Sequence, residues 1–189
     1  MQPEATSWTP GREGHRSRTF SWSDPVALDA EARGLSGLDF LRAGLEKKTP
    51  AAPIAAALDF TMLEVDAGRV LMAAVPQEFH YNPIGVVHGA LAAALLDSAT
   101  SCAVHSTLPA ELGYMTLDMS LTYVRPLTAA SGRVLCEGTV VHRGRRVSTA
   151  EGRLWIDANG KLAAHAKTTC LIVPNDGRSD DDNSANDRR

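Results

Sequence analysis

The chain has 189 residues, of which 44% are hydrophobic and only 5% aromatic, and its formal net charge is -3 at pH 7. This length suits one domain, and the apolar share is enough for a buried core filled mainly by alanine, valine and leucine. Proteins dedicated to nucleic acids carry a concentrated excess of lysine and arginine, so the charge argues against a nucleic-acid partner. Any anion-binding site of this chain must therefore be formed by a local group of basic residues.

The cysteines and the apolar stretches indicate where the protein resides. Cys102, Cys136 and Cys170 lie far apart in apolar surroundings, which favours buried free thiols over zinc or redox chemistry. The N-terminal residues lack the apolar core of a signal peptide. The longest apolar stretch, residues 83–96, is too short to span a membrane and contains His88. We therefore expect a cytoplasmic protein with neither a bound metal ion nor a membrane partner.

Polar segments flank the central part of the chain. Residues 1–33 are rich in serine, arginine and glycine and show no sustained periodicity, which predicts a flexible arm. Residues 174–189 are dominated by charged and polar side chains and predict a disordered tail. We therefore expect the folded domain, and all of the chemistry, within residues 34–173.

The folded domain begins with a predicted helix and continues with strands. Leucines recur at three- and four-residue steps in LSGLDFLRAGLEKK, which predicts an amphipathic helix that ends at Thr49-Pro50 and covers the fold. FTMLEVDA and RVLMAAV follow, separated by Gly68, and predict a hairpin. Four further strands are predicted in YMTLDMSLTYV, RVLCEGTVVHRG, RRVSTAEGRLWID and KLAAHAKTTCLIV, with turns at Gly144 and at Asn159-Gly160 joining the last three.

One long helix separates the two groups of strands. The segment GALAAALLDSATSCAVHSTL is dominated by alanine and leucine and stops at Pro109. A helix that is apolar on nearly every face must be buried nearly all round. We therefore predict an α+β fold in which a long central helix is wrapped by an antiparallel sheet. In the strand that follows, alternation places Met115, Leu117 and Tyr123 on the face that packs on the core and Thr116 on the other.

Asp97 is the most informative residue of the chain. It follows six consecutive leucine or alanine residues, and the four residues after it are uncharged. A carboxylate in such surroundings is costly unless a partner stabilises it. Asp97 is therefore either a structural acceptor, bonded to Ser101 or to a neighbouring strand, or a catalytic group.

The segment before the helix supports the catalytic alternative. HYNPIGVVHGA brings Asn82, Gly85, His88 and Gly89 to the start of the helix, where backbone N–H groups lack intrahelical partners and the helix dipole favours negative charge. An oxyanion formed from a carbonyl group needs donors of this kind. Gly89 fits there because a bare Cα lets a ligand approach the backbone. His88 fits a capping or packing role as well as that of a base.

The segment NPIGVVHGALAAALLD resembles the asparagine, glycine, HGG and aspartate pattern of the PaaI-like hotdog-fold thioesterases. The resemblance runs from about Leu35 to Val173 and implies a hotdog fold and the hydrolysis of acyl-CoA thioesters. By this resemblance, Asp97 acts as general base or nucleophile and the Gly89 N–H binds the oxyanion. Asn82 stands in the place of the family asparagine, and Thr116 corresponds to the hydroxyl that helps to hold the attacking water.

One residue departs from the family pattern. Ala90 replaces the second glycine of the HGG motif and adds a methyl group near the thioester. The remaining set is chemically sufficient, because a carboxylate can take a proton from water or attack the carbonyl itself. No cofactor is expected, since coenzyme A is part of the substrate. A Ser/His/Asp triad is the competing mechanism, but the sequence has no G-x-S-x-G motif to hold the serine.

Coenzyme A carries phosphates, so its binding calls for cations. The turn that contains Arg143, Arg145 and Arg146 is the densest basic spot of the predicted domain, and the forked donors of arginine suit phosphate. The alternative is that these are ordinary solvated turn residues. Arg125, beside Pro126, is a further candidate.

Two other functions fit the same fold. An acyl-CoA hydratase or dehydratase would normally pair a histidine with an acid, but His105 lies eight residues from Asp97, about 12 Å along the helix. A non-catalytic acyl-CoA sensor usually carries a DNA-binding domain, for which the N-terminal arm is too short. By the resemblance, aromatic or short- to medium-chain acyl groups are the expected substrates.

Helix geometry also predicts an assembly. Gly89 and Asp97 are eight residues apart, so about 12 Å separates them along one helix, and one carbonyl cannot touch both. If both act on it, the donor comes from one chain and the carboxylate from another. We therefore expect a homodimer with two shared sites, and the resemblance to hotdog proteins implies such a dimer or a dimer of dimers, a tetramer.

Overall fold

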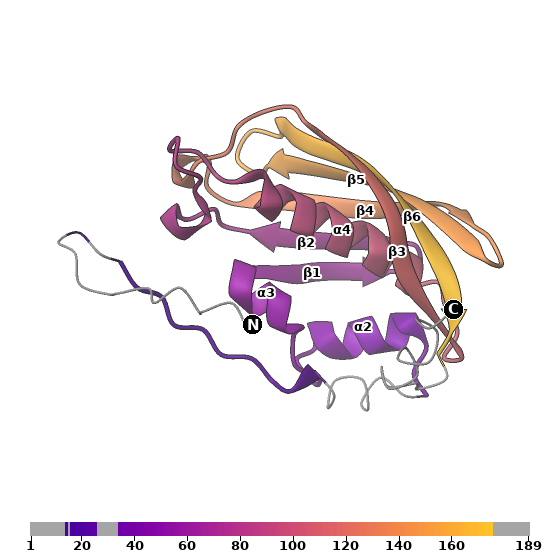
Figure 1. Ribbon diagram of the computed structural model, residues 1–189. Coiled ribbons are helices and arrows are strands. Elements are labelled where there is room, and N and C mark those ends of the chain that lie inside the picture. The colour runs from indigo at the N-terminus through magenta and orange to yellow at the C-terminus, as the bar shows by residue number, and fades with distance from the viewer. Residues whose placement is uncertain (1–13, 15, 26–33, 176–189) are drawn as a thin grey trace, which may run out of the picture.

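The computed structural model describes residues 14, 16–25 and 34–175 and shows one curved antiparallel sheet wrapped around a long helix (Figure 1). The sheet order is β1-β2-β4-β5-β6-β3. Its strands are β1 (Phe60–Asp66), β2 (Arg69–Ala74), β3 (Leu112–Tyr123), β4 (Val134–Arg143), β5 (Val147–Ile156) and β6 (Leu162–Pro174). The helices are α2 (Gly37–Leu45), α3 (Pro53–Leu58) and α4 (Gly89–His105), with short 3-10 turns η1 (Glu78–His80) and η2 (Ala129–Ser131). The predicted α+β architecture is confirmed.

The predictions for the two ends of the chain fall largely outside the described residues. Of the predicted flexible arm, residues 1–13, 15 and 26–33 are not described, and of the predicted tail, residues 176–189 are not. Within the part of the chain that the structure covers, no helix is long and apolar enough to cross a membrane.

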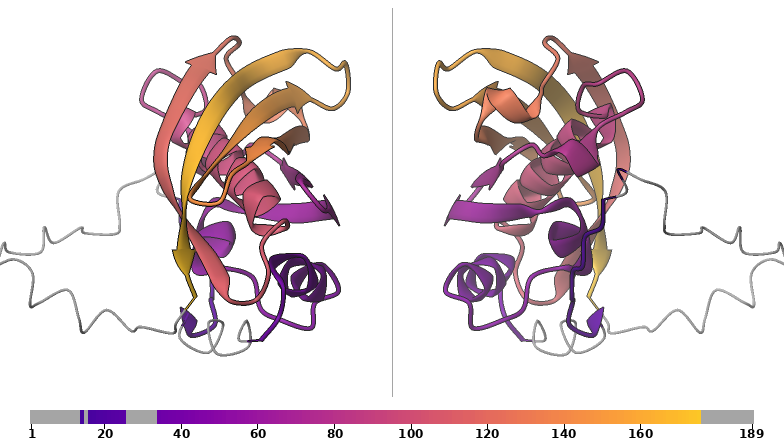
Figure 2. Two further views of the ribbon diagram at one scale, coloured as in Figure 1. Left: turned by 90° about the vertical axis from the view of Figure 1, so that its right-hand side faces the viewer. Right: turned by 90° about the vertical axis from the view of Figure 1, so that its left-hand side faces the viewer.

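Two facing glycines let α4 lie directly on the sheet. Gly138 of β4 pairs with Gly152 of β5. A Cβ on Gly138 would stand 2.2 Å from the carbonyl oxygen of Ala99, and a Cβ on Gly152 would stand 2.8 Å from Leu96 Cδ2. Ala99 and Leu96 are fully buried as a result. End views show the strands curling around α4 (Figure 2). The close approach of helix and sheet therefore depends on two missing side chains.

The prediction that α4 is buried nearly all round is wrong for one stripe. Ala90 is exposed, and Ala93, Ala94 and Asp97 are only half-buried. These positions recur at the three- and four-residue spacing of one helix face. The cause is that a single sheet covers only part of the helix circumference. Within one chain, α4 therefore leaves an uncovered stripe that contains Asp97.

The predicted alternation of β3 is wrong at Met115, Thr116 and Leu117, because the strand contains a β-bulge. Thr116 pairs with Cys170 of β6, and Asp118 pairs with the adjacent Thr169, so Leu117 is an extra residue in the ladder. An extra residue reverses which side chains face inward. Leu117 is exposed to 58% and Met115 to 59%, in contrast to the prediction, and Thr116 is the residue that meets α4.

The predicted turns are confirmed, whereas the end of the first helix is not. β1 and β2 join at Gly68, and β5 and β6 join at Gly160, and both glycines have positive φ angles, 83° and 65°. The first helix ends at Leu45 rather than Thr49, because Lys47 adopts a φ of 58° that no α-helix continues. All three thiols are free, and Cys136 and Cys170 are buried as predicted, whereas Cys102 is only half-buried.

Candidate active site

Asp97 accepts a hydrogen bond from the neighbouring strand. Thr116 Oγ1 of β3 donates to Asp97 Oδ1 over 3.1 Å, which the bulge makes possible by turning Thr116 toward α4. Ser101, the other predicted partner, instead donates to the carbonyl of Ser98. Among the described residues, no cation forms an ion pair with Asp97, so its carboxylate is not neutralised by a partner. An unpaired carboxylate held by one hydroxyl is available to take a proton.

The other ionisable groups near Asp97 are held in their protonated forms. Burial raises the pKa of the Cys102 thiol to about 12 and also raises the pKa of the Cys170 thiol. Burial likewise raises the pKa of the Tyr114 hydroxyl. At neutral pH these groups therefore carry their protons and are poor nucleophiles or bases. Of these groups, the carboxylate of Asp97 is the one suited to abstract a proton.

The N-terminus of α4 presents one backbone donor without an acceptor. His88 caps the helix: its Nδ1 accepts a hydrogen bond from the Ala90 N–H at 3.0 Å, and its carbonyl accepts one from the Leu91 N–H at 3.1 Å. Among the hydrogen bonds of the described residues, the Gly89 N–H donates to nothing. His88 therefore has the capping role, and Gly89 has the free N–H that an oxyanion requires.

A tyrosine that the sequence places on the core-facing side of its strand, without a role in the site, covers this helix end. Tyr123, the last residue of β3, donates from its hydroxyl to the carbonyl of Gly89 over 3.2 Å. A Cβ on Gly89 would stand 2.7 Å from Tyr123 Cζ, inside the ring's van der Waals surface. Gly89 is thus needed to seat the tyrosine as well as to expose its own backbone. The sequence signal for Tyr123 was its place at the end of the predicted strand.

A cavity of about 530 Å³ opens beside this helix end. Its lining is mostly apolar and includes several small side chains, with His88, Tyr123 and Arg125 as the polar members. The full lining is Val87, His88, Gly89, Ala92, Tyr123, Val124, Arg125, Pro126, Leu127, Ala163 and Ala164. The volume lies within the range of small-molecule sites, roughly 300–1,000 Å³.

Asn82 lies in the loop that leads to α4 and holds that loop in place. Its Oδ1 accepts from the Ile84 N–H at 3.0 Å, and its backbone N–H donates to the carbonyl of Val86 at 2.9 Å. Among the described residues, no hydrogen bond from its side-chain amide N–H groups is found. Ala90, the departure from the HGG pattern, is exposed on the uncovered stripe of α4.

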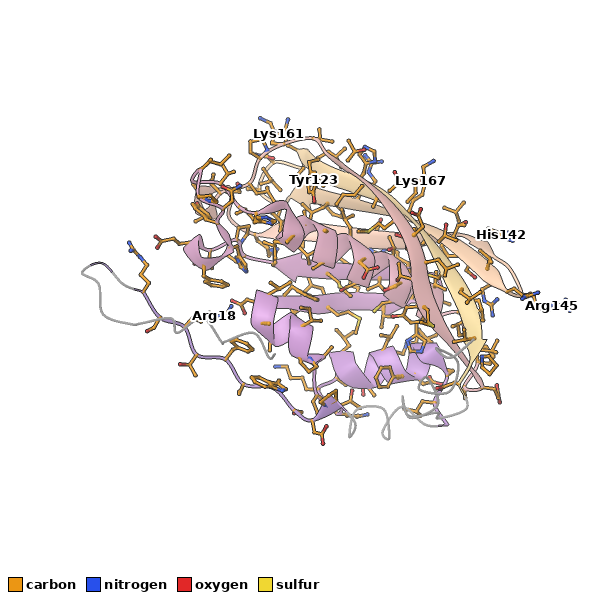
Figure 3. The ribbon with its side chains drawn as sticks, viewed as in Figure 1. Arg18, Tyr123, His142, Arg145, Lys161 and Lys167 are labelled. Carbon is orange, nitrogen blue, oxygen red and sulfur yellow. The ribbon has the colours of Figure 1, made fainter. Side chains whose placement is uncertain are left out.

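The predicted basic turn and the cavity are separate within one chain. Arg143 is the last residue of β4, Arg145 and Arg146 lie in the turn to β5, and Figure 3 shows Arg145 at the tip of the sheet, well away from Tyr123. Arg125 lines the cavity itself and donates from Nη1 to the carbonyl of Leu162 at 2.5 Å. Of the predicted cations, Arg125 is therefore the one beside the Gly89 donor.

The sequence pattern of the thioesterase superfamily matches residues 84–163, a span that holds Gly89, Asp97 and Thr116. Human acyl-coenzyme A thioesterase 13 is 29% identical over 109 residues, which are 58% of this chain and 76% of the human protein.

Two solved structures of proteins named for phenylacetic acid degradation are also similar to this chain. A phenylacetic acid degradation-related protein from Ralstonia eutropha JMP134 is 32% identical, with a TM-score of 0.62 over 69% of this chain and 97% of that chain. A variant of the phenylacetic acid degradation protein PaaI from Thermus thermophilus is 29% identical, with a TM-score of 0.57 over 64% of this chain and 98% of that chain.

Proposed function

This chain belongs to the thioesterase superfamily, has the hotdog fold and is a thioester hydrolase, and on that basis we propose that it hydrolyses the coenzyme A thioesters of small acids. The observation that carries the proposal is the Asp97 carboxylate, bonded to Thr116 on the uncovered stripe of α4, in a chain that also presents the free Gly89 N–H. The human relative's name supports coenzyme A as the thiol half of the substrate.

Asp97 supplies the proton acceptor of the proposed reaction. Its carboxylate removes a proton from water, and the resulting hydroxide attacks the carbonyl carbon of the thioester. Thr116 donates its proton to Oδ1 and keeps its oxygen lone pairs, which can accept a hydrogen bond from that water. Direct attack by Asp97 on the carbonyl would give an anhydride that water then hydrolyses. In either case the C–S bond breaks and coenzyme A leaves as the thiol.

Gly89 supplies the donor for the negative charge that develops on the carbonyl oxygen. Its N–H lies in the first turn of α4, where the helix dipole adds to the attraction. Because about 12 Å of helix separates Gly89 from Asp97, a site that uses both takes one group from each of two chains. The uncovered stripe of α4 supports this arrangement, since it leaves the Asp97 side of the helix open to a second chain.

Aromatic or short- to medium-chain acyl groups are the proposed substrates. The largely apolar cavity next to Gly89 suits such groups in size, and two solved relatives are named for phenylacetic acid degradation. Arginine side chains are proposed to bind the phosphates of coenzyme A. The candidates are Arg125 at the cavity and the arginines at the β4–β5 turn of a partner chain.

Thiol release from a panel of acyl-CoAs tests the proposal. With a thiol-detecting dye, a thioesterase releases coenzyme A from phenylacetyl-CoA and from medium-chain acyl-CoAs at kcat/KM values that rank the acyl groups. Binding without thiol release would identify a sensor. Addition of water to an enoyl-CoA without thiol release would identify a hydratase.

Arginine variants separate the two candidate phosphate sites. Arg125→Met should raise KM for acyl-CoA if the cavity binds the phosphates, and the joint replacement of Arg143, Arg145 and Arg146 by methionine should raise it if the turn does. Either increase should shrink at high salt, because screening weakens a phosphate contact. A KM that neither variant changes would contradict both assignments.

A further inference from the structure

A buried histidine lies behind the N-terminus of α4. His80, at the end of η1, is only 6% exposed. Its Nδ1 accepts from the Gln77 N–H over 3.0 Å, and its Nε2 lies 2.9 Å from the carbonyl oxygen of Leu58 in α3. An N–H can only donate and a carbonyl can only accept, so the neutral ring with its proton on Nε2 satisfies both. The His80 ring therefore ties η1 to the end of α3.

The backbone of His80 extends this attachment to α4. Its carbonyl oxygen accepts a hydrogen bond of 2.7 Å from the N–H of His88, the residue that caps α4. The next peptide unit along the chain carries the Gly89 N–H. The orientation of that N–H thus depends on where His80 holds the cap.

Arg18 of the N-terminal arm also binds the end of α3. Its guanidinium donates to the carbonyls of Ala57 at 3.0 Å and Ala56 at 3.2 Å, and Figure 3 shows Arg18 beside α3. With the bond from His80 to Leu58, three successive carbonyls at the end of α3 have partners from outside the helix. Helix C-termini lack intrahelical partners for such carbonyls, so these contacts fix the helix end.

Arg18 also touches η1 directly. Its guanidinium carbon lies 4.0 Å from the centre of the Phe79 ring, and the Phe79 and His80 rings are 4.0 Å apart. The Arg18 side chain is 28% exposed, less than that of Arg16 at 72%. A cation over the face of an aromatic ring is attracted by the ring's negative face. One arm residue therefore links α3, η1 and, through His80, the cap of α4.

We propose that Arg18 and His80 are positioning residues for the Gly89 donor. The inference rests on the proposed role of the Gly89 N–H in catalysis. Neither side chain touches the substrate; together they keep the cap, and with it the Gly89 peptide, in the orientation that meets the oxyanion. Loss of either should lower kcat with little change in KM, because the oxyanion forms only as the transition state is approached.

Arg18→Met and Arg16→Met form a matched pair in the arm. Both remove one positive charge, but the printed contacts of Arg16 are all exposed ones, an ion pair with Glu78 of η1 at 2.7 Å and a hydrogen bond to the carbonyl of Gly14 at 3.0 Å. Arg18→Met should lower kcat about tenfold and leave KM within about twofold, because misplacing a catalytic group by about 1 Å can cost a hundredfold. Arg16→Met should leave both constants within about twofold. His80→Phe, which keeps a ring but loses both hydrogen bonds, should lower kcat further. A wild-type kcat in Arg18→Met would overturn the proposal.

Amide hydrogen exchange gives a readout that does not require turnover. The His88 N–H is protected by its bond to the His80 carbonyl, so its exchange in Arg18→Met should be about tenfold faster than in wild type, and in Arg16→Met it should be unchanged. Equal exchange in the two variants would overturn the positioning role. If the wild-type protein releases no thiol from any acyl-CoA, the proposed function fails, and the exchange rates still decide whether Arg18 holds the cap.

Discussion

Replacing Gly89 by alanine and by proline separates the backbone donor from the space around it. Both variants add a Cβ that would stand 2.7 Å from Tyr123 Cζ, so the tyrosine ring must move by about 0.7 Å to reach ordinary contact. Only proline also removes the N–H. The helix should accept proline, because Gly89 is its first residue and its N–H makes no hydrogen bond within the part of the chain that the structure describes. His88 also has the extended angles, φ -63° and ψ 136°, that precede proline.

The two variants should therefore have similar melting temperatures and different rates. Moving Tyr123 should cost Gly89→Ala up to about tenfold in kcat, because a displacement of this size disturbs alignment. Gly89→Pro should lose a further factor of roughly 100 to 1,000, the usual effect of deleting one oxyanion donor. Steady-state hydrolysis of the best acyl-CoA measures kcat, and a thermal melt checks folding. If the folded proline variant turned over within about threefold of the alanine variant, the Gly89 N–H would not be the donor.

Three further predictions concern the assembly, the pH dependence of stability and the hydroxyl beside the carboxylate. Mixing Asp97→Asn chains with Gly89→Pro chains should restore about a quarter of wild-type sites after subunit exchange, because each mixed dimer collects both lesions in one site; activity that stays at the parental level would exclude a shared site. Burial lowers the pKa of His105 from its ordinary 6.5, so its contribution to stability is complete above pH 6.5 and is lost as the pH falls toward the folded-state pKa. The free energy of unfolding, measured with urea, should therefore fall less between pH 7.5 and pH 5 in His105→Phe than in wild type. An equal fall in the two proteins would contradict this. Thr116→Val should lower kcat by about tenfold, less than loss of the carboxylate, and a larger effect than that of Asp97→Asn would reverse the assigned roles.

The sequence predicted the central features of the fold, and it indicated the candidate site residues, because their signals are local. A lone carboxylate in a run of leucine and alanine is visible without a structure, and so are the turns at Gly68 and Gly160. Asp97 and the donor at Gly89 both belong to α4, whose pattern is continuous. These features follow from neighbours in the chain.

Features that depend on distant parts of the chain could not be predicted. The bulge beside Thr116 is defined by pairing with β6, more than fifty residues away, and it reverses the facing that alternation implies. The contact of Tyr123 with Gly89 spans 34 residues, and that of Arg18 with the end of α3 spans 39. The role of His80 likewise depends on Leu58, 22 residues earlier. Tertiary pairing, which has no local signature, determines all four.

The turnover of Asp97→Asn tests the proposed chemistry most directly. Asparagine is nearly isosteric, and Thr116 can still donate to its amide oxygen, so the fold and the hydrogen bond of 3.1 Å should both persist. What is lost is the capacity to take a proton or to attack a carbonyl. At saturating acyl-CoA, with a wild-type thermal melt as the check on folding, thiol release by Asp97→Asn should fall at least about a hundredfold. Near-normal thiol release by the folded variant would show that Asp97 is not the catalytic carboxylate.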